Sequence, residues 1–387
     1  GMGPSASSPY CSHLTERGRL VWRTVQTLVW AAGAWVLWAL MFSPPLGIHA
    51  FWNVLIPVAP ALLALLPGLW RNICPLGSTG LLPRHIGLSQ RRRLPVVWQS
   101  HFGLAGVVGL LAIVPLRHVV LDLHGPATAA VILVLVGLAV LSGLLFEWKS
   151  GWCAGLCPVH PVERLYGSEP ARSVHHAHCG PCMKCVSLCP DTTPGLHPLT
   201  QASLAPRRWT GTLMVGGFAG FVWGWFQVPD YAGGEGWEHL AEAYGWPLGG
   251  LMATLVLFVL VRRVTGSNHL TLLVRVFAGA AIACYYWYRL PALFGFGPFP
   301  GDGMLIDLRE TLPAWGPALS RTLTTAFFAW WLVGRRTSSR TWSVRPPIAE
   351  DLLPTSYRGR TPRPPLLRSG APTQPPGIVG GCRGRSG

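Results

Sequence analysis

Charged residues are scarce in this chain. Asp, Glu, Lys and Arg make up only 12% of its 387 residues, whereas hydrophobic residues make up 50%. Ordinary soluble domains carry roughly 25% charged residues, so this composition argues against a soluble globular protein. Acidic residues are especially few, since 15 Asp and Glu stand against 31 Lys and Arg. The low charge and high hydrophobicity favour a chain embedded in a membrane.

The chain also lacks the motifs of several protein classes. It contains no glycine-rich nucleotide-binding motif, no pair of carboxylates in a catalytic arrangement and no catalytic triad. These absences argue against hydrolysis and against direct oxidation of NAD(P)H. The net charge of +16 comes without a folded motif or an aromatic platform for bases, so nucleic acid is not an expected partner.

Apolar runs of transmembrane length recur along the chain. Several Trp residues lie near the ends of these runs, as in the aromatic belts of membrane proteins. Arg275 and Arg321 interrupt the last two runs. The runs predict eight spans: Thr24–Phe42, Phe51–Trp70, His101–Leu121, Ala127–Phe146, Gly211–Val228, Trp246–Val261, Leu270–Tyr288 and Pro317–Val333. We therefore expect an all-α polytopic membrane protein with about eight transmembrane helices.

The distribution of cations predicts how these spans are oriented. Lys and Arg accumulate before the first span and in the loops after the second, fourth, sixth and eighth spans. The loop after the fifth span instead carries Asp230, Glu235, Glu238 and Glu242, with no Lys or Arg. Cytoplasmic loops are the ones enriched in Lys and Arg. We therefore expect a multi-pass protein of the inner (cytoplasmic) membrane with both termini in the cytoplasm.

Composition divides the chain into segments. They are a cytoplasmic segment (1–23), two transmembrane hairpins with a Cys-Pro loop (24–148), a cytoplasmic stretch with a small ferredoxin-like 4Fe-4S insert (149–210), four further transmembrane helices (211–334) and a basic Pro- and Arg-rich tail (335–387). The tail lacks hydrophobic periodicity, so we expect it to be disordered. Its charge suits either simple solvation or contact with anionic membrane lipid.

One cysteine-rich stretch dominates the sequence. Its second half reads Cys179-x2-Cys182-x2-Cys185-x3-Cys189-Pro190, which is the spacing of a bacterial ferredoxin loop. Three cysteines at this interval let a short loop supply three corners of a [4Fe-4S] cubane, and the Cys before Pro serves another site. Zinc sites usually have two CxxC pairs with a longer spacer, and disulfide frameworks suit small secreted domains. Both alternatives are therefore weaker interpretations.

Two shorter Cys-Pro motifs follow apolar hairpins. Cys74-Pro75 comes after the second predicted span, and Cys153-x3-Cys157-Pro158 comes after the fourth. Because Pro ends a helix, Cys74 and Cys157 are expected at helix ends. The charge rule puts these motifs on the same, cytoplasmic side as the ferredoxin loop, in a compartment that keeps thiols reduced.

These motifs resemble those of the membrane polyferredoxins of the NapH, NosR and CcoG type. The resemblance covers roughly Phe51 to Pro190 and rests on Trp152-Cys153-Ala154-Gly155-Leu156-Cys157-Pro158, on Cys74-Pro75-Leu76-Gly77 and on the ferredoxin loop. It implies an iron–sulfur membrane protein that passes electrons between the quinone pool, or a cytoplasmic donor, and a redox partner protein. The chain departs from the family pattern at Trp70, which stands where a Cys is expected, and in having a single ferredoxin loop.

The cysteine count leaves open whether one or two clusters are bound. Two [4Fe-4S] clusters need eight ligands, and the motifs supply Cys74, Cys153, Cys157, Cys179, Cys182, Cys185 and Cys189. In one assignment the first three ferredoxin-loop cysteines hold one cluster, completed by His178, His160, Asp191 or water, and the other four cysteines hold the second. In another, Cys157 joins the first cluster and the second is left short. The third is a single cluster in the ferredoxin loop, and in every case Cys284 is expected to be a buried structural thiol.

Histidines near the spans allow a rival cofactor. A haem b held between helices needs two inward-facing His side chains at similar depth. His49 with His118 or His124 could meet this condition, whereas His101 and His118 lie at opposite ends of one predicted span. Satisfied interfacial histidines are the simpler interpretation. A quinone site near His118 or Arg117 is a further option, and no sequence motif specifies it.

Three functions remain compatible with these features. The first is a membrane-bound iron–sulfur electron-transfer protein, a component of an oxidoreductase system that exchanges electrons with a quinone pool or a partner redox protein. The second is a quinol- or metal-reducing enzyme subunit, which needs a substrate site among the spans. The third is an assembly or maturation factor for another metalloenzyme.

Overall fold

The computed structural model describes residues 16–92, 94–146, 149–168, 199, 204–266 and 269–335. All regular elements in these ranges are helices, mostly α-helices with short π-helical and 3-10 segments. The helices in chain order are α1 (Glu16–Phe42), α2 (Pro44–Ile48), η1 (His49–Leu55), α3 (Ile56–Leu65), α4 (Pro67–Ile73), α5 (Pro75–His85), α6 (Val96–Ile113), η2 (Arg117–Leu121), α7 (Gly125–Leu145), η3 (Lys149–Leu156), α8 (His160–Tyr166), α10 (Ala205–Thr212), η5 (Leu213–Gly217), α11 (Phe218–Trp225), η6 (Ala232–His239), α12 (Leu240–Thr265), α13 (Leu270–Leu293), α14 (Gly316–Ala329) and η8 (Trp330–Gly334).

Five helical stretches in the described ranges are long and apolar enough to cross a membrane. They are Glu16–Phe42, Pro44–Leu65, Gly125–Leu145, Gly236–Thr265 and Leu270–Leu293, and Val97–Ile113 is a shorter apolar helix. The predicted spans Gly211–Val228 and Pro317–Val333 also fall largely on helix, in η5 and α11 and in α14 and η8. The chain is therefore a helical membrane protein by length and composition of its helices, and the count of eight spans stays a prediction.

Several predicted spans have different bounds in the structure: the first and sixth lie in longer helices, Glu16–Phe42 and Gly236–Thr265, and the second and third are broken near Pro residues. The second was expected to reach Trp70, but α3 ends at Leu65 because Leu66, which precedes Pro67, leaves the helical conformation with φ −137° and ψ 59°. The third was expected to run from His101 to Leu121, whereas α6 runs from Val96 to Ile113 and is followed by the short η2. Pro residues near the ends of these runs shift the boundaries.

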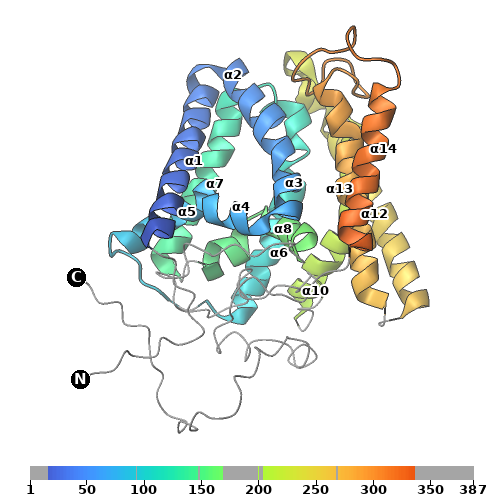
Figure 1. The fold of residues 1–387 in the computed structure, drawn as a ribbon. Coiled ribbons are helices and arrows are strands. Elements are labelled where there is room, and N and C mark those ends of the chain that lie inside the picture. Colours follow the sequence, from blue (N-terminus) through green and yellow to red (C-terminus); the bar gives the residue numbers. More distant parts are fainter. Residues whose placement is uncertain are drawn as a thin grey trace, which may run out of the picture.

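The described helices form a bundle with two distinct ends. Figure 1 shows α4, α5 and α8 toward its lower end, and α2 with the connection between α13 and α14 at its upper end. Along the bundle, α7 packs against α1 and α5, α11 packs against α12 and α13, and α13 packs against α14. The two Cys-Pro junctions, which adjoin α4, α5 and α8, therefore share one end of the molecule.

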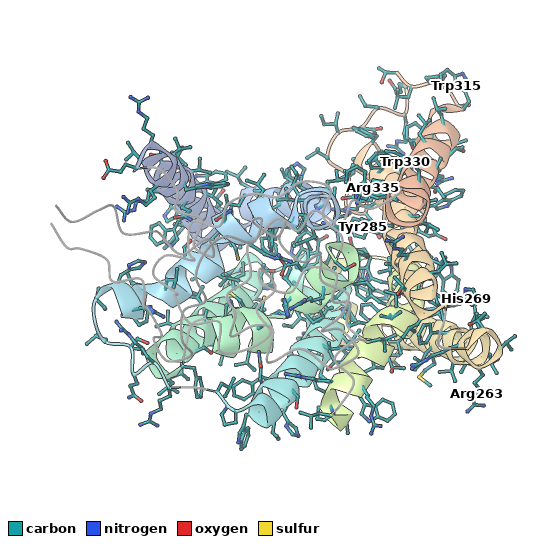
Figure 2. The ribbon with its side chains drawn as sticks, turned by 60° about the horizontal axis from the view of Figure 1, so that its bottom comes forward. Arg263, His269, Tyr285, Trp315, Trp330 and Arg335 are labelled. Atoms are coloured by element: carbon teal, nitrogen blue, oxygen red, sulfur yellow. The ribbon has the colours of Figure 1, made fainter. Side chains whose placement is uncertain are left out.

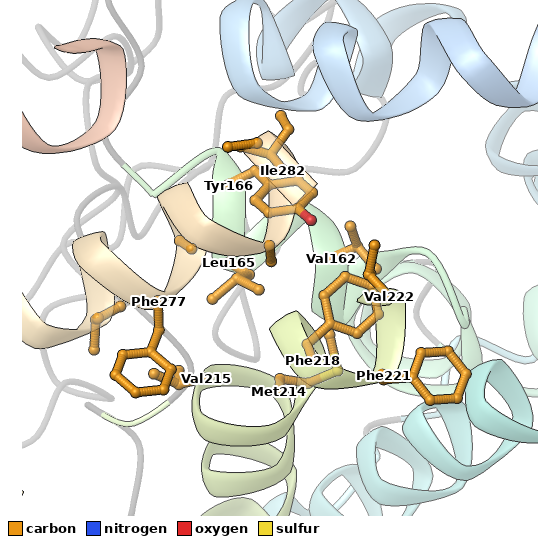
Figure 3. Close-up of a cluster of buried hydrophobic side chains, with 14 of the residues drawn as sticks. Val162, Leu165, Tyr166, Met214, Val215, Phe218, Phe221, Val222, Phe277 and Ile282 are labelled. Carbon is orange, nitrogen blue, oxygen red and sulfur yellow. The ribbon is translucent and has the colours of Figure 1, made fainter. Parts of the chain in front are cut away.

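The main hydrophobic core surrounds α8. Figure 3 shows Leu165 and Tyr166 of α8 among Phe218 of α11 and Phe277 and Ile282 of α13, all of them buried. Every residue of α8 after its first is buried. This burial holds the chain firmly at the point just after Cys157.

Exposed Trp side chains mark both ends of α14. Trp315 precedes its first turn and is 64% exposed, and Trp330 follows its last turn and is 54% exposed (Figure 2). Indole rings are common at membrane–water interfaces, but α14 also carries Ser320, Arg321 and three Thr and is not one of the apolar helices of the described ranges. The eighth predicted span, on α14 and η8, therefore stays a prediction.

Candidate metal centre

The first Cys-Pro motif forms the junction between α4 and α5. Cys74 caps both helices, with φ −55° and ψ 117°, and its backbone N–H donates to the Trp70 carbonyl oxygen at 3.0 Å. Pro75 occupies the first turn of α5, where a missing N–H costs nothing. The residue before a Pro is driven out of the helical region, so the chain turns at Cys74. This Cys lies at a helix end, as its Cys-Pro sequence predicts.

The second Cys-Pro motif ends the π-helical segment η3. Cys157 follows η3, and its N–H donates to the Trp152 carbonyl oxygen at 3.0 Å. The carbonyl oxygens at the end of η3 lie directly over Gly106 of α6, where no side chain stands in the way. Cys153 lies within η3 and contacts Leu81 of α5. The motif is thus seated between α5 and α6, at the same end of the bundle as Cys74.

Burial raises the pKa of both junction thiols. Burial raises the pKa of Cys157 to about 12, and the nearby Cys74 adds to this effect. Burial likewise raises the pKa of Cys74, and the negative charge of Glu163 raises it further. Both groups are therefore neutral thiols near pH 7 unless a cation favours their thiolate forms. A bound metal provides such a cation, because a coordinating thiol is deprotonated.

A buried ion pair connects the two cysteine junctions. Arg71 of α4 pairs with Glu163 of α8, and their side chains are only 9% and 7% exposed. His160 Nδ1 lies 3.4 Å from the other oxygen of the same carboxylate. Arg71 comes three residues before Cys74, and Glu163 comes six residues after Cys157. The pair therefore fixes α4 against α8 beside both thiols.

The charge state of this pair follows from its surroundings. Burial alone would raise the pKa of Glu163, but Arg71 and His160 outweigh it and hold this pKa at about 2. Burial lowers the pKa of His160, so its imidazole is neutral at pH 7. A neutral imidazole is the form that can bind a metal, which keeps His160 available as the predicted non-Cys ligand.

Only some of the predicted cluster ligands lie within the described residues. Within the described residues, no group of three or more His, Cys, Asp or Glu side chains has the geometry of a metal site. Cys179, Cys182, Cys185, Cys189, His178 and Asp191 lie outside the described residues. The two thiols at the junctions and the neutral His160 have donor atoms of the types that bind iron–sulfur clusters, and their assignment as ligands stays a prediction.

The remaining cysteines and histidines lie apart from the two junctions. Cys284 in α13 packs against the main core, in keeping with a structural thiol. His101 is exposed near the start of α6, whereas His118 is buried in η2 beyond the end of that helix. His49 Nδ1 lies 3.3 Å from Asn53 Nδ2, and His124 is exposed before α7. The haem pairing of His49 with His118 or His124 stays a prediction.

Sequence reasoning did not find the buried charges that pair across the fold. Glu163 and Arg71 join positions 92 apart, and Arg117 and Asp230 join positions 113 apart. The few charged residues of this apolar sequence could have indicated buried pairs, because burying an ionisable side chain is costly unless it is paired or functional. The partner of each charge could not be read, since the pairing depends on helix packing.

Fold and site together define a helical membrane protein with thiol-bearing helix junctions at one end of its bundle. Comparison with models of known protein families, with curated proteins and with solved structures gave no match.

Proposed function

We propose that this chain is a membrane electron-transfer protein that binds one [4Fe-4S] cluster in its ferredoxin loop, or two clusters to which the cysteines at the α4–α5 and η3–α8 junctions also contribute. One observation carries the proposal: Cys74-Pro75 and Cys157-Pro158, far apart in the sequence, stand at helix junctions that the buried Arg71–Glu163 pair ties together. The ferredoxin spacing from Cys179 to Cys189 follows Cys157 within a short stretch of chain. Both features support the resemblance to the membrane polyferredoxins.

The chain's own residues supply binding and positioning. An iron–sulfur cluster, when bound, accepts and returns single electrons. The thiolates of Cys74 and Cys157 would hold iron, and the Arg71–Glu163 pair would keep their two junctions together. The core around α8 excludes water from one side of the site. Such rigid, partly dry surroundings limit the structural rearrangement that accompanies electron transfer and help set the reduction potential.

The cytoplasmic face of the membrane is the proposed location of this site. Cations gather in the loops at the predicted cytoplasmic ends, and reduced thiols persist in that compartment. The donor or acceptor is proposed to be the quinone pool or a partner redox protein.

Iron and acid-labile sulfide, measured on protein purified without oxygen, test the proposal together with EPR of the reduced sample. About eight iron per chain with interacting spins would indicate two clusters, and about four with one isolated signal would indicate a single cluster. Zinc without sulfide would contradict the proposal.

Two matched variants assign the ligands. Cys182→Ser is expected to abolish a cluster signal, because Cys182 is central to the ferredoxin loop. Cys284→Ser, in α13, is expected to leave all signals intact. If Cys284→Ser removed a signal and Cys182→Ser did not, the assignment would be wrong. Cys157→Ser then separates the cluster numbers, because it is expected to reduce iron content in either two-cluster assignment and to leave it unchanged if the ferredoxin loop alone holds iron.

A further inference from the structure

A second group of charged side chains is buried at the end of the bundle opposite the cysteines. Arg117 and His118 of η2 are 3% and 4% exposed. Arg117 donates from Nη2 to Asp122 at 2.9 Å and to Asp230 at 3.0 Å, and from Nη1 to Asp230 at 3.2 Å. His118 Nδ1 lies 2.6 Å from Asp230 Oδ1. One guanidinium thus bridges two carboxyl groups, one of which also binds an imidazole.

Two more charged residues border this cluster. Arg289 of α13 is 3% exposed and donates to the Trp52 carbonyl oxygen at 2.6 Å and to Asn53 Oδ1 at 2.7 Å. Asp302 accepts a hydrogen bond from the Asp230 backbone N–H at 2.7 Å. The charged groups that act on Asp122 are therefore Arg117, Asp230 and Arg289, whereas His118 and Asp302 contact Asp230.

Polar atoms without a partner are concentrated in this cluster. His118 Nε2, Arg117 Nε and Asp122 Oδ1 are buried and have no hydrogen-bond partner in the described part of the chain. Buried polar atoms in native proteins are nearly always satisfied, by protein or by bound water. Two deprotonated carboxylates cannot hydrogen-bond each other, so a proton held between Asp122 and Asp230 would satisfy Asp122 Oδ1.

The two carboxyl groups differ in their affinity for this proton. Burial and the neighbouring Asp230 raise the pKa of Asp122 to about 7, although Arg117 opposes the shift. Burial also acts on Asp230, but Arg117 and His118 hold its pKa well below the ordinary value. Asp122 therefore carries the proton, and Asp230 remains the counterion of Arg117.

We propose that Arg117, His118, Asp122 and Asp230 form a buried proton-binding site in which Asp122 and Asp230 share one proton. Its ligand is a proton, and Asp122 Oδ1 is the buried atom left without a partner when that proton is absent. The proposal goes beyond the electron-transfer function and does not depend on iron.

The site also joins the two halves of the bundle. Arg117 and His118 follow α6, whereas Asp230 follows α11, and the Tyr231 N–H donates to the His118 carbonyl oxygen at 3.0 Å. Loss of the proton leaves two adjacent carboxylates at this contact, with a single guanidinium between them. Deprotonation therefore weakens the contact between η2 and the chain after α11.

Infrared difference spectroscopy on the full chain in lipid nanodiscs tests the site directly. A protonated carboxyl group gives its own C=O stretching band, and we expect this band at pH 5 and its loss at pH 9 with a midpoint near pH 7. Asp122→Asn should remove the band. Asp307→Asn is the matched control, since Asp307 is exposed, pairs with Arg309 and has a pKa of about 2.

Two results of the infrared experiment would contradict the proposed proton site. A wild-type protein without the band, or an Asp122→Asn variant that keeps it, would overturn the proposal. If Asp122→Asn cannot be purified, Asp122→Glu keeps a carboxyl group and should move the midpoint. An unmoved midpoint would then overturn the assignment. The infrared band does not depend on iron content. A result that overturns the proton site would therefore leave the proposed electron-transfer function unaffected.

Thermal unfolding gives a second reading of the same site. Because the folded protein holds this proton above the ordinary Asp pKa of 3.8, the stability that Asp122 contributes is fully present below that pH and falls as pH rises toward 7. Asn at this position imitates the protonated carboxyl group. Asp122→Asn should therefore gain Tm relative to wild type between pH 5 and pH 8, whereas a Tm difference that is equal at both pH values contradicts the proposal.

Discussion

Buried charges in this protein link segments that are distant in the sequence. Arg71 meets Glu163 beside the cysteine junctions, and Arg117 meets Asp230 at the other end of the bundle. In a chain with only 12% charged residues, placing charges inside the fold is costly unless each has a partner. Loss of one partner therefore matters more here than loss of an exposed pair.

Glu163→Gln tests this reasoning at the cysteine end. The substitution keeps the shape of the side chain but leaves the buried Arg71 without its carboxylate, which should lower the free energy of unfolding by about 3 kcal/mol. Thermal or denaturant unfolding measures this loss. Retention of the proposed cluster during storage should fall as well, because the pair holds α4 against α8.

Glu16→Gln is the control for that variant. Glu16 also pairs with an arginine, Arg19, but the two side chains are 94% and 58% exposed. Exposed pairs contribute about 0–1 kcal/mol, so this variant should unfold like the wild type. Equal effects of Glu16→Gln and Glu163→Gln would contradict the role of the buried pair.

At the scale of whole helices, glycines set the distance between α11 and α12. Gly220 of α11 faces Gly250 of α12 so closely that a Cβ on either would collide with the carbonyl oxygen of the other. Gly216 and Gly224 continue the same face of the helix at intervals of four residues, against Phe258 and Trp246. Small residues at this spacing let membrane helices approach closely.

Gly220→Ala is therefore expected to be destabilising. One methyl group would force α11 and α12 apart, at a cost of about 1–3 kcal/mol. Gly249→Ala is the matched control, because Gly249 is exposed on α12 and a Cβ there meets nothing. That variant should be neutral or slightly stabilising, because Ala favours helix more than Gly does. The stability of both variants in detergent, followed by circular dichroism, decides between these expectations.

At the scale of the whole molecule, the balance of cations and carboxylates differs between connecting loops. The turn after α12 follows Arg262 and Arg263, whereas the connection between α13 and α14 carries three carboxylates, Asp302, Asp307 and Glu310, and one cation, Arg309, which pairs with Asp307. Figure 1 shows the latter connection at the end away from α4, α5 and α8. This difference in charge balance supports the predicted orientation, with the cysteine junctions in the cytoplasm.

Alkaline phosphatase fusions test this orientation, since the enzyme folds only outside the cytoplasm. A fusion after Gly266, in the turn after α12, should be inactive, and a fusion after Gly301, between α13 and α14, should be active. The two fusions control for each other because only one helix separates them. Activity of both or of neither would contradict the orientation.

Local features of this protein could be predicted from its sequence. Apolar runs predicted the helices, and Pro75 and Pro158 placed Cys74 and Cys157 at helix ends. These features depend on hydropathy and on the restricted backbone around Pro, which act within a few residues. The bounds of the second and third spans were wrong because breaks near Pro67 and Pro115 fall within continuously apolar sequence.

The sequence by itself thus determined a helical membrane chain and the residue types that suit iron–sulfur binding. Only the tertiary structure decided that Cys74 lies near Cys157, that Arg71 pairs with Glu163 and that Asp122 and Asp230 meet at Arg117. The reason is physical: periodicity and spacing describe neighbours along the chain, whereas these contacts arise when helices far apart in the sequence pack side by side.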